Sequence, residues 1–119
     1  MIDFKNLFSL KGKEIFIIGG SGLIGSQIVS ALEQYDALIT VFDIDLKNKN
    51  KNENSKTKYI KFNCANEKNI KNFFINYIKK NKCPDVLINA SYPVSKDWKK
   101  NTFKEINFKS YKINIELHL

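Results

Sequence analysis

The hydrophobic residues of this chain occur in four short runs, separated by longer stretches with mixed character. The first run, Glu14–Ile18, is followed at once by glycine, as is typical of a buried strand that ends in a tight turn. Three further runs are rich in residues that favour strands: Ala37–Phe42, Tyr59–Phe62 and Val86–Ile88. The pattern therefore predicts four short strands.

Two amphipathic stretches between these strands have helical spacing. From Gly22 onward the apolar positions are Leu23, Ile24, Ile28, Val29 and Leu32, and in 66–81 they are Ile70, Phe73, Phe74, Tyr77 and Ile78. Each set falls on one face of a helix. The segment Lys47–Lys58 is almost wholly polar and predicts a loop. A helical pattern resumes near Lys104, but positions 111–119 also alternate like a strand, so both interpretations stay open.

Strands that alternate with helices predict an α/β fold, with a Rossmann-like, doubly wound parallel sheet truncated to about four strands. The simplest strand order is 3-2-1-4, with the switch point beside the first strand. The 119 residues suffice for a single domain, 1–119, but are few for a complete α/β enzyme. We expect the fourth strand to leave an open edge and uncovered apolar surface, so that the isolated chain is marginally stable or aggregates.

The composition narrows the possible partners. The formal net charge is +8, but every basic residue is Lys and the lysines are spread along the chain, so we expect no nucleic-acid partner. No apolar run reaches the ~20 residues of a membrane helix, and the N-terminus does not resemble a signal peptide, which predicts a cytoplasmic protein. Cys64, Cys83 and His118 are too few to form a zinc site, so we expect reduced thiols and no metal.

Three glycines follow the first predicted strand with a spacing of three. In such a strand-to-helix turn, Gly19, Gly22 and Gly25 would permit the turn, let a pyrophosphate approach the backbone, and let helix and strand pack closely. The N-terminus of the helix then offers free N–H groups to the phosphates. We expect Ser21 and Ile24, in the same turn, to complete the cradle.

Asp43 ends the second predicted strand, near the ~20-residue distance at which dinucleotide-binding folds place an acid. A carboxylate there accepts hydrogen bonds from both ribose hydroxyls and repels a 2′-phosphate. The sequence therefore predicts NAD as the cofactor, in preference to NADP. The alternative interpretation is that the glycines form only a turn and that Asp43 caps a strand.

The lead-in 10–13 (Leu-Lys-Gly-Lys) and the glycine motif resemble the short-chain dehydrogenase/reductase family, with a glycine spacing closer to its extended branch. The resemblance covers essentially the whole chain. It implies that Asn63 and Cys64 border the adenine, that Asn89 and Ala90 border the nicotinamide ribose, and that Asn114 supports the proton relay. Departures from the family pattern are Ile18, Asn63, Ile88 and Ser91, where the family has Thr, Asp, Asn and Gly.

The catalytic Ser and the Tyr-x-x-x-Lys pair of this family lie beyond its asparagine helix, and this chain stops at Leu119. The resemblance therefore implies an N-terminal fragment, inactive alone, of an NAD(P)-dependent oxidoreductase that is a homo-oligomer at full length. The alternative is a non-catalytic dinucleotide-binding module that acts with a partner chain. Tyr92 and Lys96 have the Tyr-x-x-x-Lys spacing, but Pro93 opposes the helix that this chemistry requires.

The same loop carries a second resemblance. Ser91-Tyr92-Pro93, followed by Lys96-Asp97-Trp98, is similar to short-chain oxidoreductases of bacterial flagellin modification, which act on sialic-acid-like sugars. This implies a sugar or sugar-nucleotide substrate held by Tyr92, Lys96 and Trp98. Trp98 would stack on the sugar ring and Lys96 would pair with an acidic group. The alternative is that Tyr92 and Trp98 only cover an edge of the core.

Overall fold

The computed structural model describes residues 7–46, 55–92, 95–100, 102 and 104–118. Its elements, in chain order, are β1 (Glu14–Ile18), α2 (Leu23–Glu33), β2 (Leu38–Asp43), β3 (Lys58–Lys61), α3 (Glu67–Lys80), β4 (Val86–Asn89), the 3₁₀ turn η1 (Trp98–Lys100) and α4 (Phe108–His118). The predicted Rossmann-like α/β fold is confirmed, and each of the four predicted strands is present within two residues of its predicted bounds.

The four strands form one parallel sheet in the order β3-β2-β1-β4, as the sequence predicts. In the central pair, β1 runs from Glu14 beside Leu38 to Ile18 beside Phe42. On its other side, β1 pairs with β4, from Ile15 beside Val86 to Ile18 beside Asn89. The carboxyl ends of all four strands therefore meet at one end of the sheet, and the chain leaves β1, β2 and β4 there.

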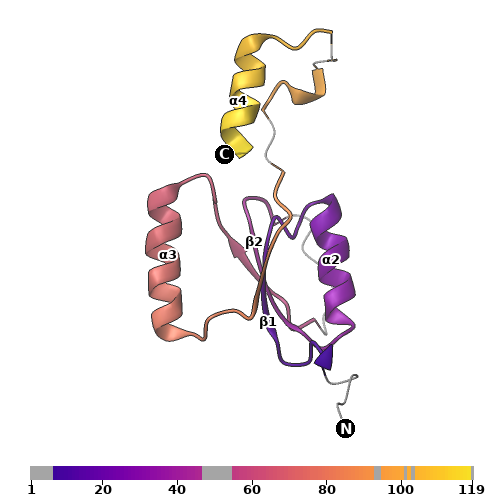
Figure 1. Cartoon of the computed structure of the whole chain (residues 1–119), viewed down its shortest axis with the longest axis vertical. Helices are drawn as coiled ribbons and strands as arrows, with labels where there is room; N and C mark the ends of the chain where they lie inside the picture. The colour runs from indigo at the N-terminus through magenta and orange to yellow at the C-terminus, as the bar shows by residue number, and fades with distance from the viewer. Residues whose placement is uncertain (1–6, 47–54, 93–94, 101, 103, 119) are drawn as a thin grey trace.

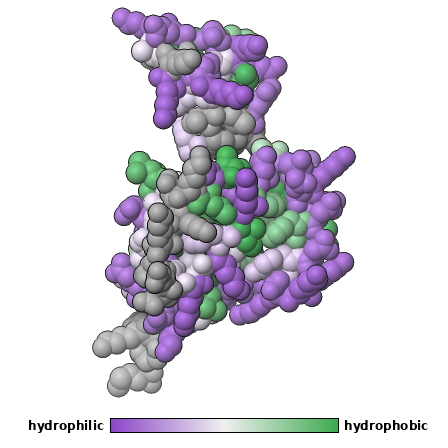
Figure 2. Space-filling model, turned by 180° about the vertical axis from the view of Figure 1, so that it is seen from behind, coloured by the Kyte–Doolittle hydropathy of each residue, from purple (hydrophilic) through white to green (hydrophobic). Residues whose placement is uncertain are grey.

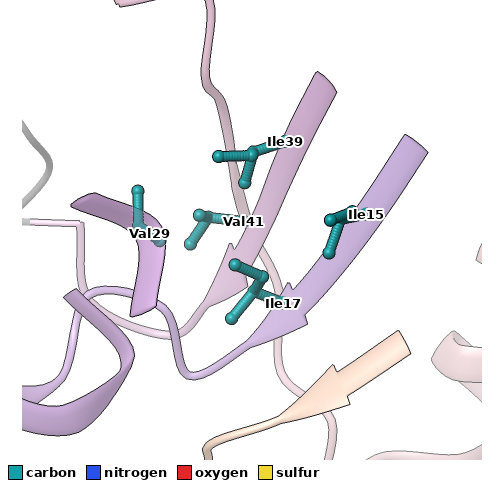
Figure 3. Packing of buried hydrophobic residues seen from close by; sticks show 5 residues of the cluster. All are labelled: Ile15, Ile17, Val29, Ile39 and Val41. Atoms are coloured by element: carbon teal, nitrogen blue, oxygen red, sulfur yellow. The ribbon is translucent and has the colours of Figure 1, made fainter. Parts of the chain in front are cut away.

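Helix α2 covers one face of the sheet and α3 covers the other (Figure 1). Successive residues of a strand point to opposite faces, so β1 serves both layers. On the α2 side, the buried cluster consists of Ile15, Ile17, Val29, Ile39 and Val41 (Figure 3). On the α3 side, the buried rings of Phe16 and Phe42 pack edge to face, with centroids 5.0 Å apart.

The α3 layer is mainly aromatic. Phe73, Phe74 and Tyr77 of α3 lie against the rings from β1 and β2, with centroid distances of 5.2–6.2 Å. The Tyr77 hydroxyl donates to Glu14 at 3.4 Å, and burial raises the pKa of this phenol, with a further contribution from the Glu14 charge. The helical face predicted for 66–81 is thus confirmed at these positions, while Ile78 stays 48% exposed.

Two sequence predictions fail at element boundaries. Leu23 and Ile24 are predicted on the buried face of α2 but are 89% and 68% exposed, because the first turn of the helix lines an open cavity. Lys58 was expected in the polar loop but begins β3. Just before it, the hydroxyls of Ser55 and Thr57 both donate to Glu33 at the end of α2, whereas residues 47–54 lie outside the described residues.

The C-terminal segment is helix α4 and not a strand, which settles the ambiguity of its sequence pattern. This helix stands beyond the carboxyl ends of the strands, joined to the sheet by the segment that follows β4 (Figure 1). Large apolar side chains stay exposed on α4 and on the edge strand β4, among them Phe108 of α4 (79%) and Leu87 of β4 (61%). The open edge and uncovered apolar surface predicted for the fourth strand are therefore present.

Most of the molecular face in Figure 2 is hydrophilic, and hydrophobic residues gather on the body that holds the sheet, below its junction with the part that holds α4. The lysines supply much of the polar surface, consistent with the net charge of +8. Within the described ranges, none of the helices combines the length and the hydrophobicity that crossing a bilayer requires.

Asp85 joins the beginnings of β1 and β4. Its carboxylate accepts the N–H of Glu14 at 2.9 Å, while its own N–H donates to the Glu14 carbonyl at 2.8 Å. Lys13 and Lys82 approach the same carboxylate at 3.6 and 3.9 Å. The hydrogen bond from Glu14, assisted by the two lysines, lowers the pKa of Asp85 below its ordinary value.

A carboxyl whose pKa is depressed by folding stabilises the fold above its unfolded pKa of about 3.9, and this stabilisation is lost as the pH falls through the folded value. Asp85→Asn should therefore lower the urea midpoint of unfolding at pH 7. The difference from wild type should shrink as the pH falls below about 4, because the carboxyl is then protonated first in the unfolded chain and, at lower pH, in the folded chain. The same difference at pH 7 and pH 3 would contradict a role for the charge.

Candidate functional site

A cavity of about 590 Å³ opens at the carboxyl ends of β1, β2 and β4. It is lined by Ile18, Gly19, Ser21, Gly22, Leu23, Ile24, Phe42, Asp43, Ile44, Asp45, Phe62, Asn63, Cys64, Ala65, Ala90, Ser91 and Tyr92. In open parallel sheets this end, at the point where the strand order reverses, is where ligands bind. The reversal here falls beside β1, from which β2 and β4 lie on opposite sides.

The turn between β1 and α2 requires glycine for two steric reasons. Gly19 has a φ of +75°, and a Cβ on it would come within 2.7 Å of the backbone of Ser91, in the segment after β4. A Cβ on Gly25 would lie 2.1 Å from the Gly19 carbonyl oxygen. The spacing of the glycine motif thus reflects two close backbone approaches, one to the β4 side and one of α2 onto the turn.

Ser21 and Asp43 connect the glycine turn to the end of β2. The Ser21 N–H donates to one carboxylate oxygen of Asp43 at 2.9 Å, and the other oxygen accepts the N–H of Asp45 at 3.2 Å. The Ser21 side chain is 5% exposed, and its hydroxyl has no hydrogen-bond partner within the part of the chain that the structure describes. A buried hydroxyl without a partner is costly, so this oxygen is a candidate contact for a ligand group that approaches the glycine turn.

The N-terminus of α2 is open to the cavity. Gly22 occupies the N-cap position and has no side chain that could satisfy the first N–H groups of the helix. Helix α3, by contrast, is capped by Asn66, whose side chain accepts from the Asn69 N–H at 3.1 Å. The first turn of α2 also carries no acidic residue, so the partial positive charge of this helix end is available to an anion.

Eight of the ten residues predicted to bind the cofactor line this cavity: Gly19, Ser21, Gly22, Ile24, Asp43, Asn63, Cys64 and Ala90. Gly25 and Asn89 do not line the cavity, but they shape the backbone that does. Gly25 lets α2 approach the turn, and Asn89 accepts the N–H (3.1 Å) and the hydroxyl (2.6 Å) of Ser91, which shapes the strand exit. Cys64 is a half-buried free thiol, and Asn63 accepts the Ala65 N–H at 2.9 Å.

Sequence reasoning missed several apolar walls of the cavity, namely Leu23, Phe42, Ile44 and Phe62, together with the second acid, Asp45. Each lies within two residues of a strand end or of the glycine turn. The signal that could have found them is this position, because residues at the carboxyl ends of parallel strands converge at one end of the sheet.

The structure brings only part of the predicted substrate set together. Tyr92 lines the cavity, and the Trp98 ring lies edge to face against it, with centroids 6.0 Å apart. Lys96 instead lines a separate hollow of about 480 Å³ between its own turn and α4. Tyr92 is in irregular backbone and Lys96 in a turn, so the two do not share the helix that a catalytic Tyr–Lys pair needs. Asn114 is buried in α4, away from the first cavity.

A parallel sheet with a glycine turn at its switch point defines the class of Rossmann-like nucleotide-binding folds. Residues 15–115 match the model of the NAD dependent epimerase/dehydratase family. The chain belongs to this family, which is part of the short-chain dehydrogenase/reductase superfamily. A search of curated protein sequences gave no match.

Solved structures share the fold at low sequence identity. A short-chain dehydrogenase from Leptospira borgpetersenii serovar Hardjo-bovis, with bound NAD⁺, is 24% identical with a TM-score of 0.78, over 100% of this chain and 45% of that one. A 4-hydroxyisoleucine dehydrogenase with NADH is 21% identical with a TM-score of 0.70, over 91% of this chain and 44% of that one. The ligand-free aldohexose dehydrogenase of Thermoplasma acidophilum is 17% identical with a TM-score of 0.67, over 90% of this chain and 38% of that one. The chain thus spans less than half the length of these proteins.

Two glycines with almost the same φ separate the effect of backbone strain from that of crowding. At Gly12 (φ +72°) a Cβ would meet no atom within 4 Å, whereas at Gly19 (φ +75°) it would meet Ser91. We expect Gly12→Ala to cost about 1–2 kcal/mol of unfolding free energy from strain alone, and Gly19→Ala to cost about 1–3 kcal/mol more from crowding. Urea unfolding measures both, and equal costs would contradict the close approach to Ser91.

Proposed function

We propose that this chain binds NAD in the cavity at the carboxyl ends of the strands, in preference to NADP. The observation that supports this most directly is the position of Asp43. Its carboxylate lies at the cavity wall, held by the Ser21 N–H of the glycine turn. A ribose with two free hydroxyls can donate to it, while a 2′-phosphate would meet its negative charge and that of the neighbouring Asp45.

The remaining groups fit the other parts of the cofactor. The open N-terminus of α2 and the buried Ser21 hydroxyl suit the pyrophosphate, and Gly19 and Gly22 line the same part of the cavity. On this proposal Asn63 and Cys64 border the adenine, and Ala90, positioned through Asn89, borders the nicotinamide ribose. Bound NAD would supply the hydride acceptor at its nicotinamide ring.

We further propose that the parent activity is oxidation or reduction of a hydroxyl or ketone on a sugar or sugar nucleotide, with flagellin or surface-glycan modification as its setting. The Ser-Tyr-Pro and Lys-Asp-Trp resemblance of residues 91–98 supports this, as does the similarity of fold to an aldohexose dehydrogenase. The Tyr92–Trp98 ring pair at the cavity offers an apolar platform for a sugar ring.

A second candidate is a dinucleotide-binding module that completes an active site with a partner chain. Two observations favour it. The cavity has the groups that a dinucleotide needs, but Tyr92 and Lys96 do not form an acid/base pair on one helix. Neither candidate expects turnover by this chain alone. A stably folded chain that binds NADH would favour the module, because a fragment with an open sheet edge is expected to be marginally stable or to aggregate. Oxidation of NADH by the chain alone, with keto-sugars or sugar nucleotides supplied, would contradict both candidates.

Asp43→Asn should weaken NADH binding, because the neutral amide keeps the size and shape of the side chain but loses the charge. Hydrogen bonds to charged groups contribute about 1.5–3 kcal/mol, so we expect an affinity loss of about tenfold or more, measured by NADH fluorescence. The preference for NADH over NADPH should fall as well.

The matched control is Asp36→Asn. Asp36 lies in the turn that precedes β2, at the opposite end of that strand, and its φ of 55° is one that asparagine tolerates. This variant removes the same charge and should leave NADH affinity unchanged. Equal losses in the two variants would point to a general effect of net charge, and no NADH binding by the wild-type chain at millimolar ligand would overturn the proposed function.

A further inference from the structure

The segment after β4 is tied to helix α4 by one buried asparagine. Asn114 is 7% exposed, and the residue beneath it in the helix, Ser110, is 3% exposed. The Asn114 side-chain oxygen accepts the N–H of Ser95 at 3.2 Å, and its amide nitrogen donates to the Ser95 hydroxyl at 2.9 Å. Two parts of the chain, nineteen residues apart in sequence, are thus joined by two hydrogen bonds at a single side chain.

The third hydrogen bond of this amide fixes its orientation. The Asn114 nitrogen also donates to the Ser110 carbonyl at 2.8 Å, one turn back in α4. With both donors and the oxygen engaged, the side chain has one favourable rotamer, because rotation would leave buried polar groups unpaired. Asn114 therefore acts as a rigid clamp between α4 and Ser95.

Local contacts connect the Asn114–Ser95 pair to Trp98 and from there to Tyr92. The Ser95 hydroxyl donates to Asp97, and the Ser95 carbonyl accepts the N–H of Trp98 at 3.1 Å. The Trp98 ring then packs edge to face on Tyr92, with centroids 6.0 Å apart and an angle of 72° between the ring planes. Tyr92 lines the main cavity, although it is 65% exposed, so its position there depends on what lies behind it.

We propose that Asn114 is a positioning residue, which holds Trp98 against Tyr92 through Ser95 and so fixes the wall of the cavity beside Ala90 and Ser91. This inference rests on the proposed function, since its effect is on dinucleotide binding. It assigns the side chain of Asn114 a role in shaping the site, distinct from the support of a proton relay that the family resemblance implies. Helix α4 thereby contributes to the cavity without lining it.

Trp98 is the single tryptophan of the chain, so its fluorescence reports on the clamp without a label. In the full 119-residue chain, Asn114→Ala should shift the Trp98 emission to longer wavelength and increase its quenching by acrylamide, before any ligand is added. NADH affinity should fall about three- to tenfold, the loss expected when one or two hydrogen bonds that hold the wall are removed. Quenching of Trp98 by bound NADH should weaken in parallel.

A gentler second variant guards against misfolding of the first. Ser95→Ala removes the hydroxyl that Asn114 and Asp97 contact but leaves the Asn114–Ser110 bond within α4 intact. It should change Trp98 and NADH affinity in the same direction, with an unchanged far-ultraviolet circular dichroism spectrum. The matched control is Asn76→Ala, the same substitution at an exposed position of α3, which should change neither readout.

The outcomes separate the clamp from the cofactor site. Unchanged Trp98 quenching in both variants would overturn the clamp. Greater Trp98 exposure with unchanged NADH affinity would overturn its link to the cavity. Asp43→Asn should weaken NADH binding while leaving ligand-free Trp98 as in wild type. If the wild-type chain binds no NADH, the proposed function fails and with it the link to dinucleotide binding, whereas the ligand-free Trp98 readouts still decide whether the clamp exists.

Discussion

The carbonyl oxygen of Gly19 lies only 2.1 Å from where a Cβ on Gly25 would be, and Gly19 itself passes against the backbone of Ser91. This crowded turn is the constraint on which the rest of the structure depends. It brings α2 down onto β1 and sets the exit of β4 beside the exit of β1. Because both approaches involve backbone atoms, neither can be relieved by a side chain that moves aside.

The cavity follows from that turn. With α2 so close, its uncapped N-terminus lies at the carboxyl ends of the strands, and the Ser21 N–H reaches Asp43 at the end of β2. The groups suited to the ribose and to the pyrophosphate are thus coupled by a hydrogen bond before any ligand binds. Preorganisation of this kind lowers the entropic cost of binding, since the receptor groups are already oriented.

The sequence predicted most of this because its strongest signals are local. Short apolar runs that end at glycine or at Asp43 located the strands, and alternating element types predicted the parallel order around β1. The spacing of the glycines and the acid indicated the cavity at the carboxyl ends of the strands. Periodicity predicts Leu23 and Ile24 to be buried, since it marks the apolar face of a helix but not the part of that face that lines an open cavity.

The features that could not be predicted depend on contacts between distant residues. The spacing of Ser95 and Asn114 along the sequence does not predict their paired hydrogen bonds. The pattern of 111–119 fitted a strand as well as a helix. Likewise, Lys96 has the spacing of a catalytic partner for Tyr92, yet the chain directs it to a different hollow. Spacing along the sequence specifies chemistry only where the backbone conformation is known.

The central claim, that the glycine turn and Asp43 form one dinucleotide site, is tested most directly by amide chemical-shift mapping of the ¹⁵N-labelled chain with NAD⁺. The account predicts the largest shifts in the turn from Gly19 to Gly25 and at Asp43 and Ile44, with little change at the exposed Ile75 and Ile78 of α3. Shifts confined to scattered lysines, or no shifts at millimolar NAD⁺, would contradict it.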